Sequence, residues 1–366
     1  MTADFHPRLL WQKLLAPIDA PLLALAAILV VLSLAIVASA SPERMASQLL
    51  NVGAALLVMR LAAQLSPQRL MRLALPIYVG GMLLLVAVAL FGDVSKGARR
   101  WLNLGVMRVQ PSELMKIAMP LMLAWYFQKR EALIRLRDYA FAALLLLLPV
   151  ALIAKQPDLG TAILVLAAGF YVIFFAGLSW KILAGLALSA AAAAPLAWTL
   201  MRDYQRARIL TLLDPEQDPL GKGFHIIQST IAIGSGGIFG KGWAQGTQAQ
   251  LEFIPERHTD FIFAVLSEEF GLIGNLLLLL LYALLIARGL MIAANAPTMF
   301  TRLLAGSITL IFFTYAFVNM GMVSGILPVV GVPLPFISYG GTALVTLFVG
   351  VGILMSIHRH RMLVQK

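Results

Sequence analysis

The side chains that could do chemistry gather at a few points between long apolar stretches, and the densest group lies between residues 96 and 116. Its members are Lys96, Arg99, Arg100, Arg108, Gln110, Glu113 and Lys116. Guanidinium and ammonium groups at this density are suited to bind an anion such as pyrophosphate. Glu113 and Lys116 stand three residues apart, so on a helix they can form an ion pair. The alternative is that the cations contact lipid headgroups and that the pair is structural.

Two further groups are weaker indications when each is taken alone. Asp158 ends the sequence KQPD (155–158) between two apolar stretches, where a tight turn accounts for it equally well. Arg202, Arg206 and Arg208 begin a long mixed segment, about 201–260, and solvated surface residues would have the same appearance. We treat all four as candidate substrate-binding residues because they map to the same predicted face as the first group.

The sequence PERHTDFIFAVLSEEFG (255–271) supplies a candidate general base. We expect Thr259 to cap a helix and Asp260 to lie in its first turn, at the membrane boundary among cations. A base that acts on a lipid-anchored sugar would have to lie there, although an Asp at a helix start is often only structural. On a continuous helix, Glu268 and Glu269 would lie roughly 12 Å deeper. We expect one of them to be neutral or paired with a cation.

Several site chemistries are excluded or disfavoured by the residues present. The chain has no Cys, so it has no thiolate nucleophile and no disulfide, and its five His are scattered. The glycine-rich stretch GSGGIFGKGWAQG (234–246) does not match a phosphate-binding P-loop. No Ser stands in a G-x-S-x-G elbow. The sequence therefore favours neither an ATPase nor a serine hydrolase, and it identifies no metal ligands.

The elements that must position these groups are membrane-spanning helices. The chain has 366 residues, of which 60% are hydrophobic and 12% charged, against about 25% charged in an ordinary soluble domain. We predict an all-α polytopic membrane protein with about ten transmembrane helices and one large extracytoplasmic loop, about 201–260, between helices 7 and 8. The expected helices are 21–39, 47–64, 73–91, 112–128, 139–154, 159–178, 181–200, 261–287, 303–325 and 340–357. The broken stretch 325–341 would be tolerated at membrane depth only inside protein or along a cavity.

The distribution of basic residues predicts the orientation. With an even number of spans and both termini cytoplasmic, fifteen Lys and Arg residues face the cytoplasm together with four acidic residues. The opposite face then has twelve basic and ten acidic residues. This bias follows the positive-inside rule, so the formal net charge of +11 is a topology signal and gives no reason to expect nucleic acid. The candidate site residues therefore face outward.

The motifs that carry these residues resemble the successive signatures of the SEDS family (shape, elongation, division, sporulation). They are GARRWLNLG, VQPSELMK, KQPDLGTA, the long loop that ends in PERHTDFIFAVLSEEFG, and PLPFISYGG. They follow the family's order from about residue 96 to residue 341. Within the family, IAIGSGGIFGKG and GTQAQLEFIPE are more similar to the rod-shape members than to the division members. The resemblance implies one integral membrane domain over residues 1–366.

The resemblance also implies a function. It indicates a peptidoglycan glycosyltransferase that polymerises lipid II for cell-wall elongation in the bacterial cytoplasmic membrane. Asp260 corresponds to the aspartate that is essential in the family, which would act as general base while outer-face Arg and Lys bind pyrophosphate. A divalent cation, Mg²⁺ or Mn²⁺, is the one candidate cofactor.

The expected partners are a class B penicillin-binding protein that acts as transpeptidase, membrane proteins of the elongation complex, the polyprenyl-pyrophosphate-linked glycan and membrane lipids. We expect the single anchor helix of the transpeptidase to dock on 261–287 and 303–325. The small residues Ala305, Gly306 and Ser307 would allow close approach there. The alternative function is a lipid II flippase or another polytopic lipid transporter, with Glu113, Lys116, Glu268 and Glu269 along its path. A purely scaffolding role explains none of the outer cations.

Overall fold

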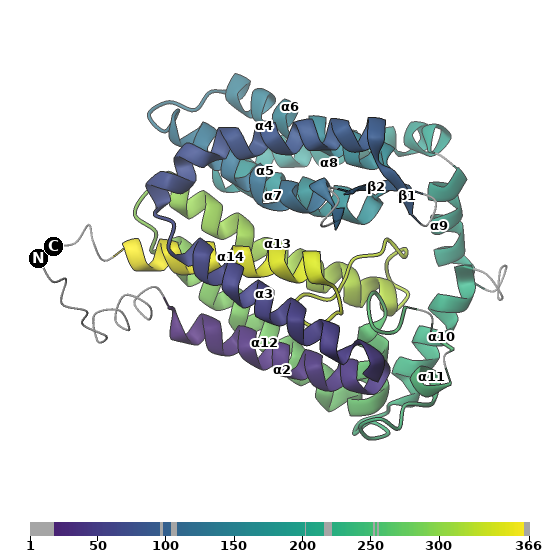
Figure 1. The fold of residues 1–366 in the computed structure, drawn as a ribbon. Helices are drawn as coiled ribbons and strands as arrows, with labels where there is room; N and C mark the ends of the chain where they lie inside the picture. Colours follow the sequence, from purple (N-terminus) through teal and green to yellow (C-terminus); the bar gives the residue numbers. More distant parts are fainter. Residues whose placement is uncertain are drawn as a thin grey trace, which may run out of the picture.

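The computed structural model describes residues 18–95, 98–103, 108–201, 203–215, 222–251, 253–254 and 256–361. Within these ranges the chain is a bundle of long helices, shown in Figure 1. The long helices are α2 (Ala20–Ala40), α3 (Met45–Ala63), α4 (Pro67–Phe91), α5 (Pro111–Gln128), α6 (Leu136–Lys155), α7 (Leu159–Phe175), α8 (Trp180–Leu200), α12 (Ile262–Ala294), α13 (Met299–Val323) and α14 (Gly341–His360). Each overlaps one of the ten predicted spans, so the predicted fold class is confirmed.

Eight segments are long and apolar enough to cross a bilayer by length and composition. They comprise α2, α4, α6, α8, α12, α13, α14 and the segment Pro42–Ala63, which joins a short 3-10 helix (Pro42–Arg44) to α3. The helix α7 has 17 residues and is apolar but shorter. The helix α5 carries Glu113 and Lys116 and packs against α4, α7 and α13. The described residues thus form a multi-pass membrane protein.

Short elements connect the long helices at one end of the bundle. A three-stranded antiparallel sheet, in the order β1 (Asp93–Ser95), β2 (Ala98–Asn103) and β3 (Arg108–Val109), joins α4 to α5. The predicted large loop contains α9 (Asp203–Leu213), α10 (Lys222–Ser235) and α11 (Thr247–Gln250). Figure 1 shows α9 and α10 running across the ends of the long helices.

The opposite end of the bundle brings the start of α2 beside α12 and the end of α14. Asp19, which caps α2, forms an ion pair of 2.5 Å with Arg288 and lies 3.4 Å from the His358 ring. Burial acts to raise the pKa of Asp19, but hydrogen bonds from Arg288 and the Leu22 N–H hold that pKa below its ordinary value. The first and last described spans therefore meet at one end, as an even number of crossings requires.

The centre of the bundle is α13, which packs against α12, α7 and α5. The Ser307 hydroxyl donates to the Ala168 carbonyl of α7 at 2.7 Å, and Gly306 faces the Phe175 ring so closely that an added Cβ would lie 2.9 Å from it. Ala305 is fully buried as well. The expectation that these small residues form a lipid-facing docking site is therefore wrong, because they allow α7 and not a partner to approach α13.

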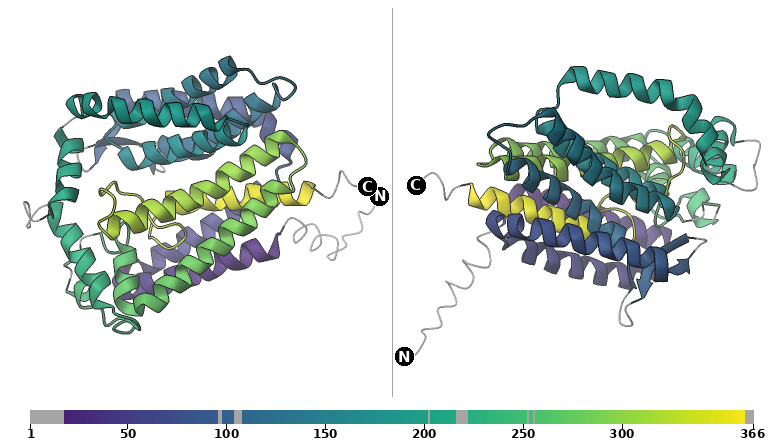
Figure 2. Two further views of the ribbon diagram at one scale, coloured as in Figure 1. Left: turned by 180° about the vertical axis from the view of Figure 1, so that it is seen from behind. Right: turned by 90° about the horizontal axis from the view of Figure 1, so that it is seen from above.

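One span stands apart from this core. No side chain of α8 is buried, and the right view of Figure 2 shows α8 at the edge of the molecule, away from the other long helices. At its end, the Arg206 guanidinium of α9 donates to the carbonyls of Trp198 and Thr199 at 2.9 and 2.5 Å. These carbonyls belong to the last turn of α8, where carbonyl groups have no hydrogen-bond donor within the helix. The predicted anion ligand Arg206 thus serves as a cap for α8.

The helix α12 is broken near its start, which corrects the predicted depth of Glu268 and Glu269. Gly271 has φ 64° and ψ −158°, far from helical values. The Ser267 hydroxyl lies 2.9 Å from the Asn275 side-chain oxygen, although residues eight apart on a straight helix are about 12 Å apart. The segment Ile262–Phe270 therefore folds back on the longer part of α12, and the two carboxylates lie at the turn instead of deeper along one helix.

These carboxylates are held by the outer segments. Glu268 is fully buried, pairs with Lys241 at 2.7 Å and accepts hydrogen bonds from the Gln248 N–H and the Thr247 hydroxyl. Glu269 accepts a hydrogen bond from the Ser39 hydroxyl of α2. The expectation that one of the two is paired with a cation is confirmed. The glycine-rich stretch 234–246 thus wraps the turn of α12 and supplies the cation.

Candidate functional site

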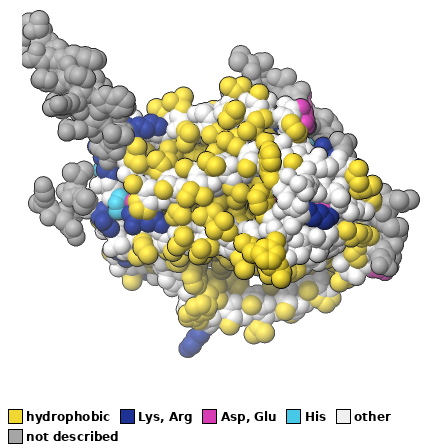
Figure 3. Space-filling view, turned by 90° about the horizontal axis from the view of Figure 1, so that it is seen from below, with side chains coloured by type: hydrophobic (Ala, Val, Ile, Leu, Met, Phe, Trp, Pro, Cys, Tyr) yellow, Lys and Arg dark blue, Asp and Glu magenta, His cyan; other side chains and the backbone are white. Residues whose placement is uncertain are grey.

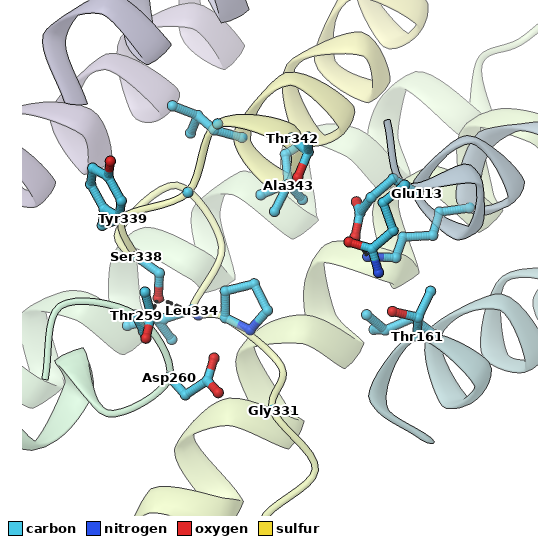
Figure 4. Close-up of a pocket in the computed structure, with 18 of the residues that line it drawn as sticks. Glu113, Thr161, Thr259, Asp260, Gly331, Leu334, Ser338, Tyr339, Thr342 and Ala343 are labelled. Atoms are coloured by element: carbon cyan, nitrogen blue, oxygen red, sulfur yellow. Dashed lines mark hydrogen bonds and ion pairs between the residues drawn. The ribbon is translucent and has the colours of Figure 1, made fainter. Parts of the chain in front are cut away.

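A cavity of about 440 Å³ opens between the sheet, α5 and α7 on one side and the turn 256–260, the broken stretch and the start of α14 on the other. Figure 4 shows its lining, with Asp260 beside Gly331 and with Glu113 and Thr161 across from them. Six of the residues predicted from the sequence line this cavity: Arg100, Gln110, Glu113, Lys116, Asp158 and Asp260. Residues that are up to 160 positions apart in the chain thus share one chamber.

Asp260 does not lie in the first turn of a helix, as predicted, but precedes it. The helix α12 begins at Ile262, and the Thr259 hydroxyl donates to the Glu256 carboxylate at 3.0 Å instead of capping that helix. The carboxylate of Asp260 reaches the backbone of Gly331, where an added Cβ would lie 3.3 Å from its Oδ2 atom. Gly331 has φ 74°, a conformation that other residues rarely adopt. Asp260 is therefore set in a tight turn against a glycine of the broken stretch.

The broken stretch is held in place by side chains from separate helices, which bind its carbonyls. Tyr282 of α12 donates to the Pro335 carbonyl at 2.7 Å, and Ser33 of α2 donates to the Ile337 carbonyl at 2.6 Å. The Ser338 hydroxyl donates to the Thr259 carbonyl at 2.6 Å and so joins the stretch to the turn of Asp260. Irregular backbone at membrane depth requires such partners. The expectation that this stretch lies inside protein or along a cavity is confirmed.

The predicted pair of Glu113 and Lys116 forms on α5, at the inner wall of the cavity. The Lys116 ammonium lies 2.6 Å from a Glu113 carboxylate oxygen and donates to the Tyr315 hydroxyl of α13 at 2.5 Å. The Lys116 side chain is only 2% exposed, so its charge depends on these two partners. The second Glu113 oxygen, Oε2, is buried and has no hydrogen-bond partner in the described part of the chain.

Asp158 lies across the cavity at the start of α7. One of its carboxylate oxygens accepts from the Thr161 N–H at 3.3 Å and so caps α7, while the other accepts from the Gln110 amide at 2.9 Å. The Arg100 guanidinium donates to the carbonyl of Pro157, in the turn before Asp158. The predicted tight turn at 155–158 is confirmed. Asp158 therefore has a structural role even though it faces the cavity.

The remaining predicted cations are not among the described lining residues. Lys96 and Arg202 lie outside the described residues, and of Arg108 only the backbone in β3 is described. Arg99 is exposed, and neither it nor Arg208 lines the cavity. Among the residues that the structure describes, the lining has two cations and three carboxylates.

Other lining residues escaped the sequence analysis. They are mostly hydroxyl-bearing, aromatic or glycine residues, among them Trp101, Thr161, Thr259, Ser338, Tyr339 and Thr342. Most of them belong to motifs that were noticed for their charges or their breaks. Ser338 and Tyr339 lie in the apolar stretch 325–341, whose Pro and Gly content is the signal that could have found them.

His258 stands two residues before Asp260 and beside the lining residue Tyr339. Its ring contacts the Tyr339 ring edge to face at 5.6 Å, and the Arg44 guanidinium lies 5.2 Å from the centre of the same Tyr339 ring. Burial lowers the pKa of His258, and the positive charge of Arg44 lowers it further. His258 is therefore held in its neutral form more firmly than a solvent-exposed histidine would be.

The described residues do not fit the cation that the sequence analysis named as a candidate cofactor. Within the described ranges, no group of three or more His, Asp or Glu side chains is close enough to hold a metal ion. Asp158 already caps α7, and one Glu113 oxygen already pairs with Lys116.

Comparisons with known proteins agree with this architecture. The chain is 51% identical to the peptidoglycan glycosyltransferase MrdB of Escherichia coli (strain K12) over 370 aligned positions, which cover all of both chains. It is 40% identical to a probable peptidoglycan glycosyltransferase FtsW of Geobacter metallireducens, with 78% of this chain and 76% of that one covered.

Solved structures give the same result. A chain of a peptidoglycan synthase complex, solved to explain how polymerization and crosslinking are coordinated, matches with a TM-score of 0.82 and 39% identity and covers 94% of this chain and 98% of that one. The rod shape determining protein RodA of Thermus thermophilus matches with a TM-score of 0.72 and 33% identity, covering 94% of this chain and 97% of that one. The family model FTSW_RODA_SPOVE, described as cell cycle protein, matches residues 13–363. With its motifs, its helical bundle and this match over nearly its whole length, the chain belongs to the FtsW/RodA/SpoVE family, which is the SEDS family.

Proposed function

We propose that this protein is a peptidoglycan glycosyltransferase of the cell-elongation machinery, which polymerises lipid II with Asp260 as its general base. The full-length similarity to proteins named for this activity supports the reaction class. The observation that carries the assignment of the base is the cavity, in which Asp260 lies beside Gly331 and shares one chamber with Arg100 and Lys116.

The chemistry is a single displacement at a sugar carbon. The 4-hydroxyl of the acceptor N-acetylglucosamine attacks the anomeric carbon of the donor glycan, and Asp260 takes the hydroxyl proton as the new bond forms. The bond from the anomeric carbon to the polyprenyl pyrophosphate breaks, and the pyrophosphate leaves with the electron pair. Arg100 can neutralise the developing negative charge. Lys116 can add to this electrostatic field from the inner wall. The hydroxyl attacks the anomeric carbon from the face opposite the leaving pyrophosphate and inverts its configuration, so an α-linked donor gives a β-1,4 bond.

The test of the base is Asp260→Asn in purified protein supplied with lipid II. Asn has the same shape but cannot take the proton, so glycan synthesis should fall by roughly 10²- to 10⁴-fold while the melting temperature stays the same. Asp158→Asn is the matched control, because Asn also caps helices well and Asp158 lines the same cavity. A well-folded Asp260→Asn protein that polymerises at a near-normal rate would show that another group is the base.

A reconstituted assay separates this function from the alternative transporter. Liposomes containing the protein are supplied with lipid II in the outer leaflet, and both glycan polymer and lipid II movement between leaflets are measured. Polymer formation that Asp260→Asn abolishes supports the enzyme. Movement of lipid II between leaflets without polymer would support the flippase and overturn the proposal.

We further propose that the anchor helix of a class B penicillin-binding protein docks on the exposed face of α12. Figure 3 shows a largely apolar surface with charged residues near its ends. On α12, Leu272, Leu276 and Leu280 follow one another at intervals of four residues and are at least half exposed. A photo-crosslinker at Leu276 should capture the transpeptidase in cells, whereas one at the buried Leu285 should not. Equal capture at both positions, or none at Leu276, would contradict this surface.

The orientation belongs to the same proposal. Both ends of the chain would lie in the cytoplasm, and α9, α10 and the mouth of the cavity would face outward from the bacterial cytoplasmic membrane. The bias of basic residues and the position of α9 and α10 opposite the start of α2 in Figure 1 support this assignment. In this orientation the chain forms a single membrane domain over residues 1–366. Its site acts on lipid-linked precursors and contacts membrane lipids.

A further inference from the structure

A buried amide lies directly behind Asp260. Asn319 is fully buried in the apolar helix α13, four residues after Tyr315. Its Nδ2 atom donates to the Asp260 carbonyl at 2.8 Å and to the Val332 carbonyl at 2.7 Å. A primary amide nitrogen carries two protons, so both bonds can form at once.

The two carbonyls that Asn319 binds belong to the segment of Asp260 and to the broken stretch. One is the peptide of Asp260 itself, and the other belongs to the residue after Gly331, beside which the Asp260 side chain lies in Figure 4. The amide therefore fixes the backbone of Asp260 relative to the surface against which its side chain rests. The Asn319 oxygen, Oδ1, has no hydrogen-bond partner among the described residues, so the side chain serves here as a double donor.

Neighbouring side chains bind the same broken stretch without reaching Asp260. Tyr282 holds the Pro335 carbonyl and Ser33 holds the Ile337 carbonyl, each with one hydroxyl bond. These residues stabilise the wall of the cavity, whereas Asn319 connects that wall to the peptide of Asp260. The difference allows a structural role to be separated from a role in the reaction.

We propose that Asn319 is a positioning residue for Asp260, which sets the carboxylate at the distance from the acceptor hydroxyl that proton transfer needs. This inference rests on the proposed function of Asp260 as general base. Asn319 lies behind the cavity wall and is not among its lining residues, so its loss leaves substrate contacts in place. A reacting group displaced by about 1 Å can lose about 10²-fold in rate.

The experiment compares Asn319→Leu, which keeps a similar volume without donors, with Tyr282→Phe, which removes one hydroxyl bond to the same stretch. For Asn319→Leu we expect kcat for lipid II polymerisation to fall roughly 10- to 100-fold, with KM changed less than about twofold. Tyr282→Phe should keep a near-normal kcat, even where its melting temperature falls equally. If Asn319→Leu does not fold, Asn319→Asp keeps the shape with at most one donated proton and should show a smaller loss of kcat.

A double variant decides whether Asn319 acts through Asp260. In the Asp260→Asn background, Asn319→Leu should lower the residual rate no further, because there is no base left to position. An additional drop of the same size, an effect on KM alone, or an equal loss in Tyr282→Phe would overturn the inference. If Asp260→Asn itself is active, the proposed function fails. If Asp260→Asn is inactive but Asn319→Leu has normal activity, the proposed function stands and the inference about Asn319 fails.

Discussion

Gly331→Ala is the most direct perturbation of the contact between Asp260 and the broken stretch. Gly331 has φ 74°, so an Ala there is forced into the left-handed region at a cost of roughly 1–2 kcal/mol. Its new methyl group would also lie 3.3 Å from the Asp260 Oδ2 atom. That distance is a few tenths of an ångström too short for a relaxed contact, so the carboxylate must shift.

The size of the shift sets the expected loss of activity. If a displacement of about 1 Å costs about 10²-fold, a few tenths of an ångström should lower the rate of glycan polymerisation by roughly 3- to 10-fold. The backbone strain should appear separately as a lower melting temperature. Gly331→Ala should therefore lose stability and activity together.

Gly325→Ala is the matched control for the backbone strain. Gly325 lies in the same broken stretch and has φ 73°, but its added Cβ would meet only the methyl groups of Ile226 and Thr230 at 3.5 and 3.6 Å. It should lose a similar amount of stability and keep its polymerisation rate. Both variants are compared by thermal unfolding and by lipid II polymerisation at one temperature below both transitions. Equal loss of activity in the two variants, or full activity in Gly331→Ala, would refute the reasoning from the carboxylate contact.

Three further outcomes are expected. Because the chain has no Cys, a cysteine at Gln245 should react with a membrane-impermeant thiol reagent in intact cells and one at Glu131 only after permeabilisation; the reverse pattern would invert the topology. Lys116→Met should lower the free energy of unfolding by about 3–5 kcal/mol in thermal unfolding, because Glu113 is left buried without its cation. Adding Glu113→Gln should restore most of that stability. No recovery would mean that the loss of the ion pair is not the cause. Burial and Arg44 lower the pKa of His258 in the folded state, so the unfolded chain binds a proton at this histidine first and stability falls as the pH drops through about 6.5. Between about pH 7.5 and about pH 5.5, the melting temperature of His258→Gln should therefore fall less than that of the parent. An equal fall in both proteins would count against this titration.

Most of the spans were predictable because eight of them are long apolar segments, and burial of such segments in a bilayer is strongly favoured. The break in α12 was not, since Gly271 sits in a sequence that is otherwise suited to a continuous helix. Its φ of 64° is stabilised by contacts with the glycine-rich stretch, where the Leu272 N–H donates to the Gly237 carbonyl at 2.9 Å. Such a fold-back depends on tertiary partners that periodicity does not reveal.

The candidate site was predictable where charge marks it and unpredictable where backbone makes it. Asp260, Glu113 and Lys116 stand out in an apolar chain because charges are costly there without a purpose. Arg206 stands out equally, and its guanidinium binds carbonyls at the end of α8. Charge identifies residues that need partners, but only the fold shows whether the partner is a carbonyl or a substrate.

The bonds that hold the broken stretch also constrain the order in which the protein can be assembled. Ser33 and Ile337 are separated by 304 positions, yet the hydroxyl of one is bound to the carbonyl of the other. Chains are made from the N-terminus, so the donors on α2, α12 and α13 enter the membrane before their acceptors in 332–337 exist. Every shorter nascent chain must keep those donors satisfied by other means. The cavity is therefore among the last features to form during synthesis, and a chain that ends before the start of α14 would contain nearly all of its spans and no complete site.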